Sequence, residues 1–147
     1  MVDADLQSYF DTIPKQPLLA LVKEKVSDGG ILALLQRFLD QDVMDGMKRW
    51  TPVSGTAQGS VISPLLANLY LHGLDEFISE SGCRYARFAD DFVALCRTRQ
   101  EAEATLAKIQ AWVEQHGLQL HPDKTRLGNC MEKGQGFEFL GYRFEAG

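Results

Sequence analysis

The chain has 147 residues, 45% of them hydrophobic, and a formal net charge of −5 at pH 7. This length suits a single domain, 1–147, with enough apolar side chains to close a core. The acidic balance argues against a chain that grips a nucleic-acid backbone by itself, because such binding depends on clustered lysine and arginine. Three cysteines without C-x-x-C spacing disfavour a disulfide framework and a zinc site, and they favour a reducing compartment. Without a secretory leader or a long apolar run, we expect a cytoplasmic protein with no membrane partner.

The N-terminal part reads as a strand followed by two helices. Residues 2–6 have the character of a short strand, and Pro14 helps to end the extended stretch that follows it. Apolar side chains at helical spacing predict one helix over 18–26 and a second, amphipathic helix over 31–39, with Gly29 as the stop between them. We expect both helices to be scaffold.

A loop and an apolar helix come next. From Gln41 to Gly59 the helical periodicity lapses, and glycines and Pro52 predict a loop or an irregular hairpin. Ser63 and Pro64 are typical of a helix start, with the serine as N-cap and the proline at the first helical position. This helix is apolar on nearly every side, so we expect it to be buried.

Two adjacent carboxylates, Asp90 and Asp91, separate two apolar runs over 85–89 and 92–96, which predicts a hairpin with both acids at its tip. A two-residue turn favours residues with positive φ, yet no glycine lies in this hairpin. Strain and like-charge repulsion next to apolar strands are best relieved by a divalent cation. A solvated surface turn is the alternative.

The rest of the chain completes an alternating pattern of strands and helices. Thr98 and Glu101 fit a capping box, which opens a helix that ends at Gly117. Short strands around 118–120 and 137–144 finish the chain. The fold class is therefore α+β, a split β-α-β-β-α-β (ferredoxin-like) antiparallel sheet with helices packed on one face.

This topology has a consequence for the acids, because the first strand and the hairpin become neighbours in the sheet. Asp5 then lies beside Asp90 and Asp91, although it is far from them in the sequence. Three carboxylates at one sheet edge are enough to hold two Mg²⁺ ions, which prefer carboxylate and phosphate oxygens.

Five ordered blocks of the chain resemble the group II intron-encoded reverse transcriptases, and the part that matches is the polymerase palm. The resemblance covers almost the whole chain, in matching order and spacing. The blocks are Asp5-Leu6-Gln7-Ser8-Tyr9-Phe10-Asp11-Thr12-Ile13, the run from Gly55 to Leu71, Arg87-Phe88-Ala89-Asp90-Asp91-Phe92-Val93, the run from Gly117 to Thr125, and Phe139-Leu140-Gly141-Tyr142.

The resemblance implies a two-metal polymerase site. Asp5, Asp90 and Asp91 would be its metal-binding carboxylates, and the backbone carbonyl of Leu6 would be a further ligand. Two Mg²⁺ ions, for which Mn²⁺ can substitute, would activate the primer 3′-hydroxyl and neutralise the triphosphate. The plainer alternatives are an exposed acid at a strand end for Asp5 and a turn residue that only tunes the site for Asp91.

The nucleotide-binding residues implied by the resemblance are Leu6, Phe10, Gln58, Gly59, Phe88 and Ala89. Phe10 stands where the family places an aromatic ring under the incoming sugar, which would exclude a 2′-hydroxyl; the alternative is a core phenylalanine. Gln58 and Gly59 match the block that lies against the nucleotide and the template base, or else form an ordinary turn. Ala57 departs from the proline usual in that block, so the loop is expected to be less rigid.

Two further sets of residues carry implied roles. Lys124 stands where the family has a lysine near the pyrophosphate, a general acid for the leaving group, unless it simply belongs to a Pro-Asp-Lys turn. Phe139, Leu140, Gly141 and Tyr142 resemble the strand that supports the primer terminus, and they also read as a plain closing strand.

The function implied is an RNA-directed DNA polymerase that acts on an RNA template, a DNA primer and a dNTP, and that binds its intron RNA in the full-length protein. We expect the fingers and thumb to lie outside this chain, which would leave it inactive in isolation. A non-catalytic RNA-binding or maturase fragment and a retron or CRISPR-associated reverse transcriptase are alternatives. Intact Asp5, Asp90 and Asp91 count against the non-catalytic fragment. A nucleotide cyclase on the same fold is disfavoured because the hairpin tip lacks a Gly-Gly-acidic turn.

Overall fold

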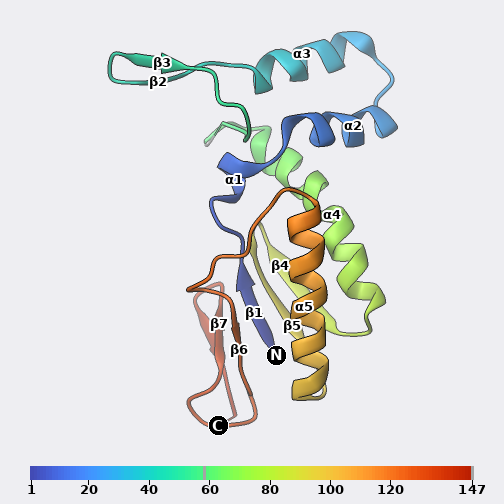
Figure 1. Ribbon diagram of the computed structural model, residues 1–147, viewed down its shortest axis with the longest axis vertical. Helices are drawn as coiled ribbons and strands as arrows, with labels where there is room; N and C mark the ends of the chain where they lie inside the picture. The colour runs from blue at the N-terminus through green and yellow to red at the C-terminus, as the bar shows by residue number, and fades with distance from the viewer. Residues whose placement is uncertain (58, 147) are drawn as a thin grey trace. The chain divides into compact units, whose positions relative to one another are not determined.

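The structure is a computed structural model and describes residues 1–57 and 59–146. The chain divides into two compact units, one formed by Met1–Gln7 with His72–Gly147 and the other by Ser8–Leu71. Figure 1 labels the elements of both units. We describe each unit by itself.

The first unit is built on a four-stranded antiparallel sheet with the strand order β4-β5-β1-β6. Its strands are β1 (Val2–Asp5), β4 (Arg84–Phe88), β5 (Asp91–Leu95) and β6 (Arg126–Leu127). β1 pairs with β5 on one side and with β6 on the other. The predicted hairpin is therefore confirmed, and so is its position next to the first strand.

The last strand of the sheet differs from the expectation. Residues 118–120 contribute one isolated bridge, between Leu6 and Leu120, and the sheet is completed by β6 instead. Pro122 lies two residues after Leu120, and a proline cannot donate a ladder hydrogen bond. The expected closing strand over 137–144 is a separate two-stranded hairpin of β7 (Phe137–Phe139) and β8 (Tyr142–Phe144).

Helix α5 (Arg99–Gln115) and the part of helix α4 (Ser63–Glu80) from His72 onward supply the helical layer of this sheet; the residues of α4 before His72 belong to the second unit. The capping box at Thr98 and Glu101 is confirmed, since both of its hydrogen bonds are present. Ile109 and Val113 of α5 are fully buried, as is Phe92 of β5. The two helices also meet, because a Cβ on Gly73 of α4 would lie 3.3 Å from Trp112 of α5. The split β-α-β-β-α-β sheet with helices on one face is confirmed.

Helix α4 is less buried than its composition predicts. Its buried side chains recur at helical spacing along one face and include Leu66, Tyr70, Leu74 and Ile78. Leu65, on another face, is 67% exposed. The expectation of burial on nearly every side was wrong, because one face of α4 is enough to cover the core. Within the described residues, none of the helices combines the length and apolar character that crossing a membrane requires.

The second unit contains the two predicted scaffold helices and an irregular hairpin. Its elements are α1 (Tyr9–Thr12), α2 (Lys15–Lys25), α3 (Gly29–Leu39), β2 (Val43–Asp45) and β3 (Lys48–Trp50). Gly29 does not stop the first helix as expected but begins the second. The reason is an N-cap, since the Asp28 side chain accepts a hydrogen bond from the Ile31 backbone N–H at 2.9 Å.

Candidate active site at the β1–β5 edge

The turn of the β4–β5 hairpin consists of Ala89 and Asp90. Asp91 is already the first residue of β5 and pairs with Phe88, so only one of the two acids lies at the tip. Ala89 has a φ of 54°, which supplies the positive φ of the first turn position without a glycine. The strain expected from the sequence is therefore carried by Ala89 and not by the acids.

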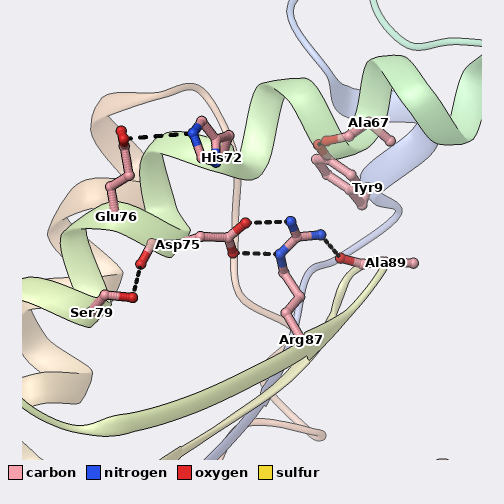
Figure 2. Close-up of polar contacts among 8 residues, drawn as sticks. All are labelled: Tyr9, Ala67, His72, Asp75, Glu76, Ser79, Arg87 and Ala89. Atoms are coloured by element: carbon pink, nitrogen blue, oxygen red, sulfur yellow. Dashed lines mark hydrogen bonds and ion pairs between the residues drawn. The ribbon is translucent and has the colours of Figure 1, made fainter.

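An ion pair between helix α4 and strand β4 holds the turn of the hairpin in place. Arg87 donates from Nε and Nη2 to the two carboxylate oxygens of Asp75 in α4, at 2.7 and 2.6 Å. Its Nη1 donates to the Ala89 carbonyl at 2.8 Å, which links α4 to the turn, as Figure 2 shows. The Arg87 side chain is only 9% exposed, because it turns inward to Asp75.

Strand pairing brings the predicted carboxylates to one end of the sheet. Asp5, the last residue of β1, lies directly opposite Asp91 of β5, and opposed residues share a face of the sheet. The backbone N–H of Leu6 donates to the Asp90 carbonyl at 3.3 Å, which ties the turn to the end of β1. Asp5 and the Asp90–Asp91 pair, which are far apart in the sequence, are thus neighbours in this unit.

The acids affect one another electrostatically. Burial raises the pKa of Asp91, and the charges of Asp3, Asp5 and Asp90 raise it further. The pKa of Asp90 is also raised, first by burial and then by the charge of Asp5, against the lowering effect of a backbone hydrogen bond. The site disfavours negative charge on both residues, which is the condition that a bound cation would relieve.

Lys124 is the cation that the structure places among these acids. Its Nζ lies 2.6 Å from Asp5 Oδ2, and this hydrogen bond raises the pKa of the lysine. The segment before it is anchored to the end of β1, because the His121 N–H donates to the Asp5 carbonyl at 2.8 Å. Lys124 itself is mostly exposed, whereas the side chain of Asp5 is 15% exposed.

Sequence reasoning missed one member of the cluster. Asp3 was not among the predicted site residues, yet it is 9% exposed and its charge raises the pKa of Asp91. Arg126 of β6 donates to Asp3 Oδ2 at 2.8 Å, and its positive charge balances the charge of the Asp3 carboxylate. The sequence pattern that could have revealed Asp3 is its i, i+2 spacing from Asp5, because residues two apart in a strand place their side chains on the same face.

The donor chemistry of this cluster fits a hard divalent cation, since it consists of carboxylate oxygens with mutually unfavourable charges. Asp5, Asp90 and Asp91 supply the carboxylates that could hold such an ion. In the described part of the chain, however, no three His, Cys, Asp or Glu side chains stand in a ligating arrangement. Asp5 forms an ion pair with Lys124 instead.

The other predicted residues of this unit differ in exposure: Leu6 is buried, Ala89 and Phe139 are partly buried, and Phe88, Leu140 and Tyr142 are exposed. Phe88, at the end of β4, is 62% exposed. The Phe139–Tyr142 block is not one strand but the turn of the β7–β8 hairpin, which corrects the prediction. Leu140 and Gly141 both have positive φ, the requirement of a type I′ turn, and this turn reverses the chain.

Two predicted blocks meet within the second unit. The Thr56 N–H donates to the Phe10 carbonyl at 2.7 Å, and a Cβ on Gly55 would lie 2.7 Å from the same oxygen. Phe10 is partly buried, with its ring centroid 5.7 Å from that of Tyr9. Gly59 is exposed with a φ of 80°. The predicted role of Gln58 lies outside the described residues.

Comparison with known proteins points to one family. The family model described as reverse transcriptase (RNA-dependent DNA polymerase) matches residues 1–144. Protein YkfC of Escherichia coli (strain K12) is 30% identical, over 97% of this chain and 46% of its own length. The group II intron-encoded protein LtrA of Lactococcus lactis subsp. cremoris is 35% identical, over 58% of this chain and 14% of its own.

A solved structure shows the same fold. Telomerase from Candida albicans, in complex with a fragment of telomeric RNA, matches with a TM-score of 0.74. At 15% identity, covering 97% of this chain and 29% of that one, the likeness concerns the fold alone and agrees with a polymerase palm. The chain spans about half or less of the length of each relative named here.

Proposed function

The chain belongs to the reverse transcriptase (RNA-dependent DNA polymerase) family, and we propose that its β1–β5 edge is the catalytic centre of an RNA-directed DNA polymerase of the group II intron type. The observation that carries this proposal is the pairing of Asp5 with Asp91, beside the turn that holds Asp90. A polymerase palm needs carboxylates converging from separate strands, and this register supports such a convergence.

Reverse transcriptases use divalent metal ions; for this chain we propose two Mg²⁺, with Mn²⁺ as a substitute. The ligands would be Asp5, Asp90 and Asp91 with the Leu6 carbonyl. When bound, these ions lower the pKa of a primer 3′-hydroxyl and neutralise the charge of the triphosphate. Support comes from the raised pKa values of Asp90 and Asp91, because a cation at this edge would offset the repulsion that raises them.

Lys124 would hold a proton close to the leaving group. A lysine ammonium is protonated at neutral pH, and this side chain is exposed, so Nζ could leave Asp5 if a cation bound that carboxylate. In the proposed reaction the ammonium group would donate its proton to the departing pyrophosphate.

The substrates proposed are an RNA template, a DNA primer and a dNTP, and in the longer protein the intron RNA. Phe10 would select against a 2′-hydroxyl, Gln58, Gly59, Phe88 and Ala89 would line the nucleotide, and the Phe139–Tyr142 turn would lie on the primer side. The relatives are much longer than this chain. We therefore expect primer extension to require the longer protein, and the isolated chain to be inactive.

Metal binding tests the site without requiring activity. Mn²⁺ is titrated into the full chain, into Asp90→Asn and into Glu103→Gln, with the free ion followed by electron paramagnetic resonance. Glu103→Gln is a matched control, since it removes the same charge near the start of α5, beyond the end of β5 that lies opposite the acids. We expect weaker binding by about tenfold or more for Asp90→Asn and no change for Glu103→Gln. Equal binding by all three proteins would refute the assignment.

Primer extension by a longer protein that contains this chain tests the reaction. Asp90→Asn should abolish extension on an RNA template, and retained extension would defeat the two-metal assignment. Phe10→Val should raise ribonucleotide incorporation while leaving extension with dNTPs in place. Unchanged sugar discrimination would remove Phe10 from the proposal and leave the metal site standing.

A further inference from the structure

Two thiols face each other at the end of the β4–β5 hairpin that lies opposite the acids. The last residue pair of the ladder is Arg84 with Leu95, and Cys83 and Cys96 stand one position beyond it on the two strands. Their Sγ atoms are 3.1 Å apart, and both cysteines are free. The sequence gives little sign of this pair, because the spacing of the cysteines matches none of the common motifs.

The backbone geometry of this position suits a disulfide. Directly opposed residues in an antiparallel ladder have Cα atoms about 4.5 or 5.5 Å apart, according to the type of pair. Both values lie within the range of about 4.4–6.8 Å that disulfides span. The two sulfurs can therefore bond without a rearrangement of the strands.

The thiols open onto a cleft with basic walls. The cleft has a volume of about 600 Å³ and is lined by Cys83 and Cys96, together with Arg84, Arg97 and Lys108. Glu101 is the acid among its lining residues. Both cysteines are partly exposed, so a small molecule can reach the sulfurs. The excess of positive charge favours a small anionic reagent over a neutral or cationic one.

The two sulfurs differ in reactivity. Thr105 Oγ1 lies 3.5 Å from Cys83 Sγ and 3.8 Å from Cys96 Sγ. Burial opposes ionisation of Cys83, but hydrogen bonds from Thr105 and Cys96 outweigh it and lower the pKa of this thiol. Burial, followed by the contact with Cys83, raises the pKa of Cys96 to about 11. Because the thiolate is the nucleophile, Cys83 attacks first.

We propose that Cys83 and Cys96 form a redox-modification site, which closes to an intramolecular disulfide by exchange with an anionic low-molecular-weight disulfide of the glutathione type. The Cys83 thiolate attacks one sulfur of the reagent, forming a mixed disulfide and releasing one thiolate, which takes up a proton. Cys96 then loses its proton and attacks Cys83 Sγ, forming the Cys83–Cys96 bond and releasing the second thiol. The protein dithiol is oxidised by two electrons, and the reagent is reduced to two thiols.

The test uses the full, reduced chain with glutathione disulfide as the reagent. After timed exposure, remaining thiols are alkylated, and the protein is digested with trypsin and analysed by mass spectrometry. The chain cleaves after Arg84 and Arg97, so Cys83, Cys96 and Cys130 fall in separate peptides. We expect the Cys83 and Cys96 peptides to become disulfide-linked about tenfold faster than Cys130 acquires glutathione.

Two variants separate the steps, and they keep the fold because serine replaces each thiol conservatively. Cys96→Ser should trap glutathione on Cys83 as a stable mixed disulfide, whereas Cys130→Ser should close the disulfide at the unchanged rate. A persistent mixed disulfide on Cys83 in the unaltered chain would overturn the proposal, and so would a Cys96–Cys130 link. Links between separate chains as the main product would do the same.

Discussion

The Asp75–Arg87 ion pair offers a sharp test of how the candidate site is supported. Asp75→Asn keeps the shape of the side chain but removes its charge and one of its two acceptor oxygens. The pair is neither fully exposed nor fully buried, because the Asp75 side chain is 28% exposed and the Arg87 side chain is 9% exposed. Breaking a fully buried pair costs about 3–5 kcal/mol, and breaking an exposed pair costs about 0–1 kcal/mol.

We therefore expect Asp75→Asn to lower the free energy of unfolding by about 2 kcal/mol, the range of one hydrogen bond to a charged group. With a urea slope of about 2 kcal/mol per M, the unfolding midpoint should fall by about 1 M. Trp112 reports on the unit that contains this pair, so its fluorescence is followed in a Trp50→Phe background, which removes the only other tryptophan.

Glu103→Gln is the matched control, because it breaks an exposed ion pair with Arg99 in the same unit, with side chains 51% and 84% exposed. Its expected cost is about 0.5 kcal/mol or less. If Asp75→Asn costs no more than Glu103→Gln, the bridge from α4 to the Ala89–Asp90 turn does not stabilise the hairpin.

Three further predictions concern single positions. Gly55→Ala should lower the free energy of unfolding by about 2–3 kcal/mol more than Gly59→Ala does. A Cβ on Gly55 would lie 2.7 Å from the Phe10 carbonyl oxygen, whereas a Cβ on Gly59, at a similar positive φ, would meet nothing within 4 Å. Urea unfolding followed by Trp50 fluorescence checks this, and equal losses for the two variants would contradict it. Thr98→Ala should lower the free energy of unfolding by about 1 kcal/mol through loss of the capping box, and an unchanged urea midpoint would show that the cap contributes nothing. Asp91→Asn should stabilise the protein at pH 7 in EDTA, because a folded-state pKa raised above the unfolded value costs stability once the pH exceeds both. That gain should shrink as the pH falls through the folded-state pKa, and should vanish below the unfolded-state pKa of about 3.9; a gain that is independent of pH would refute the electrostatic cause.

Much of the architecture follows from local patterns in the chain. The capping box of α5 and the β4–β5 hairpin are short-range features, in which neighbouring residues decide the structure. The alternation of strands and helices then leaves few topologies, and those topologies predict that Asp5 lies beside the hairpin. The prediction failed where local signals conflict, as at Gly29, which the Asp28 cap turns from a helix stop into a helix start.

By itself, the sequence determined the family, the β4–β5 hairpin beside the first strand and the meeting of Asp5 with the hairpin acids, because motif order and local pairing signals are written along the chain. Only the tertiary structure decided the contacts between residues whose spacing carries no signal. Arg87 turns inward to Asp75, Lys124 reaches Asp5, and Cys83 meets Cys96 across the hairpin. Each of these contacts depends on the packing of a helix, a loop or a strand end against the sheet, and no periodicity in the sequence records that packing.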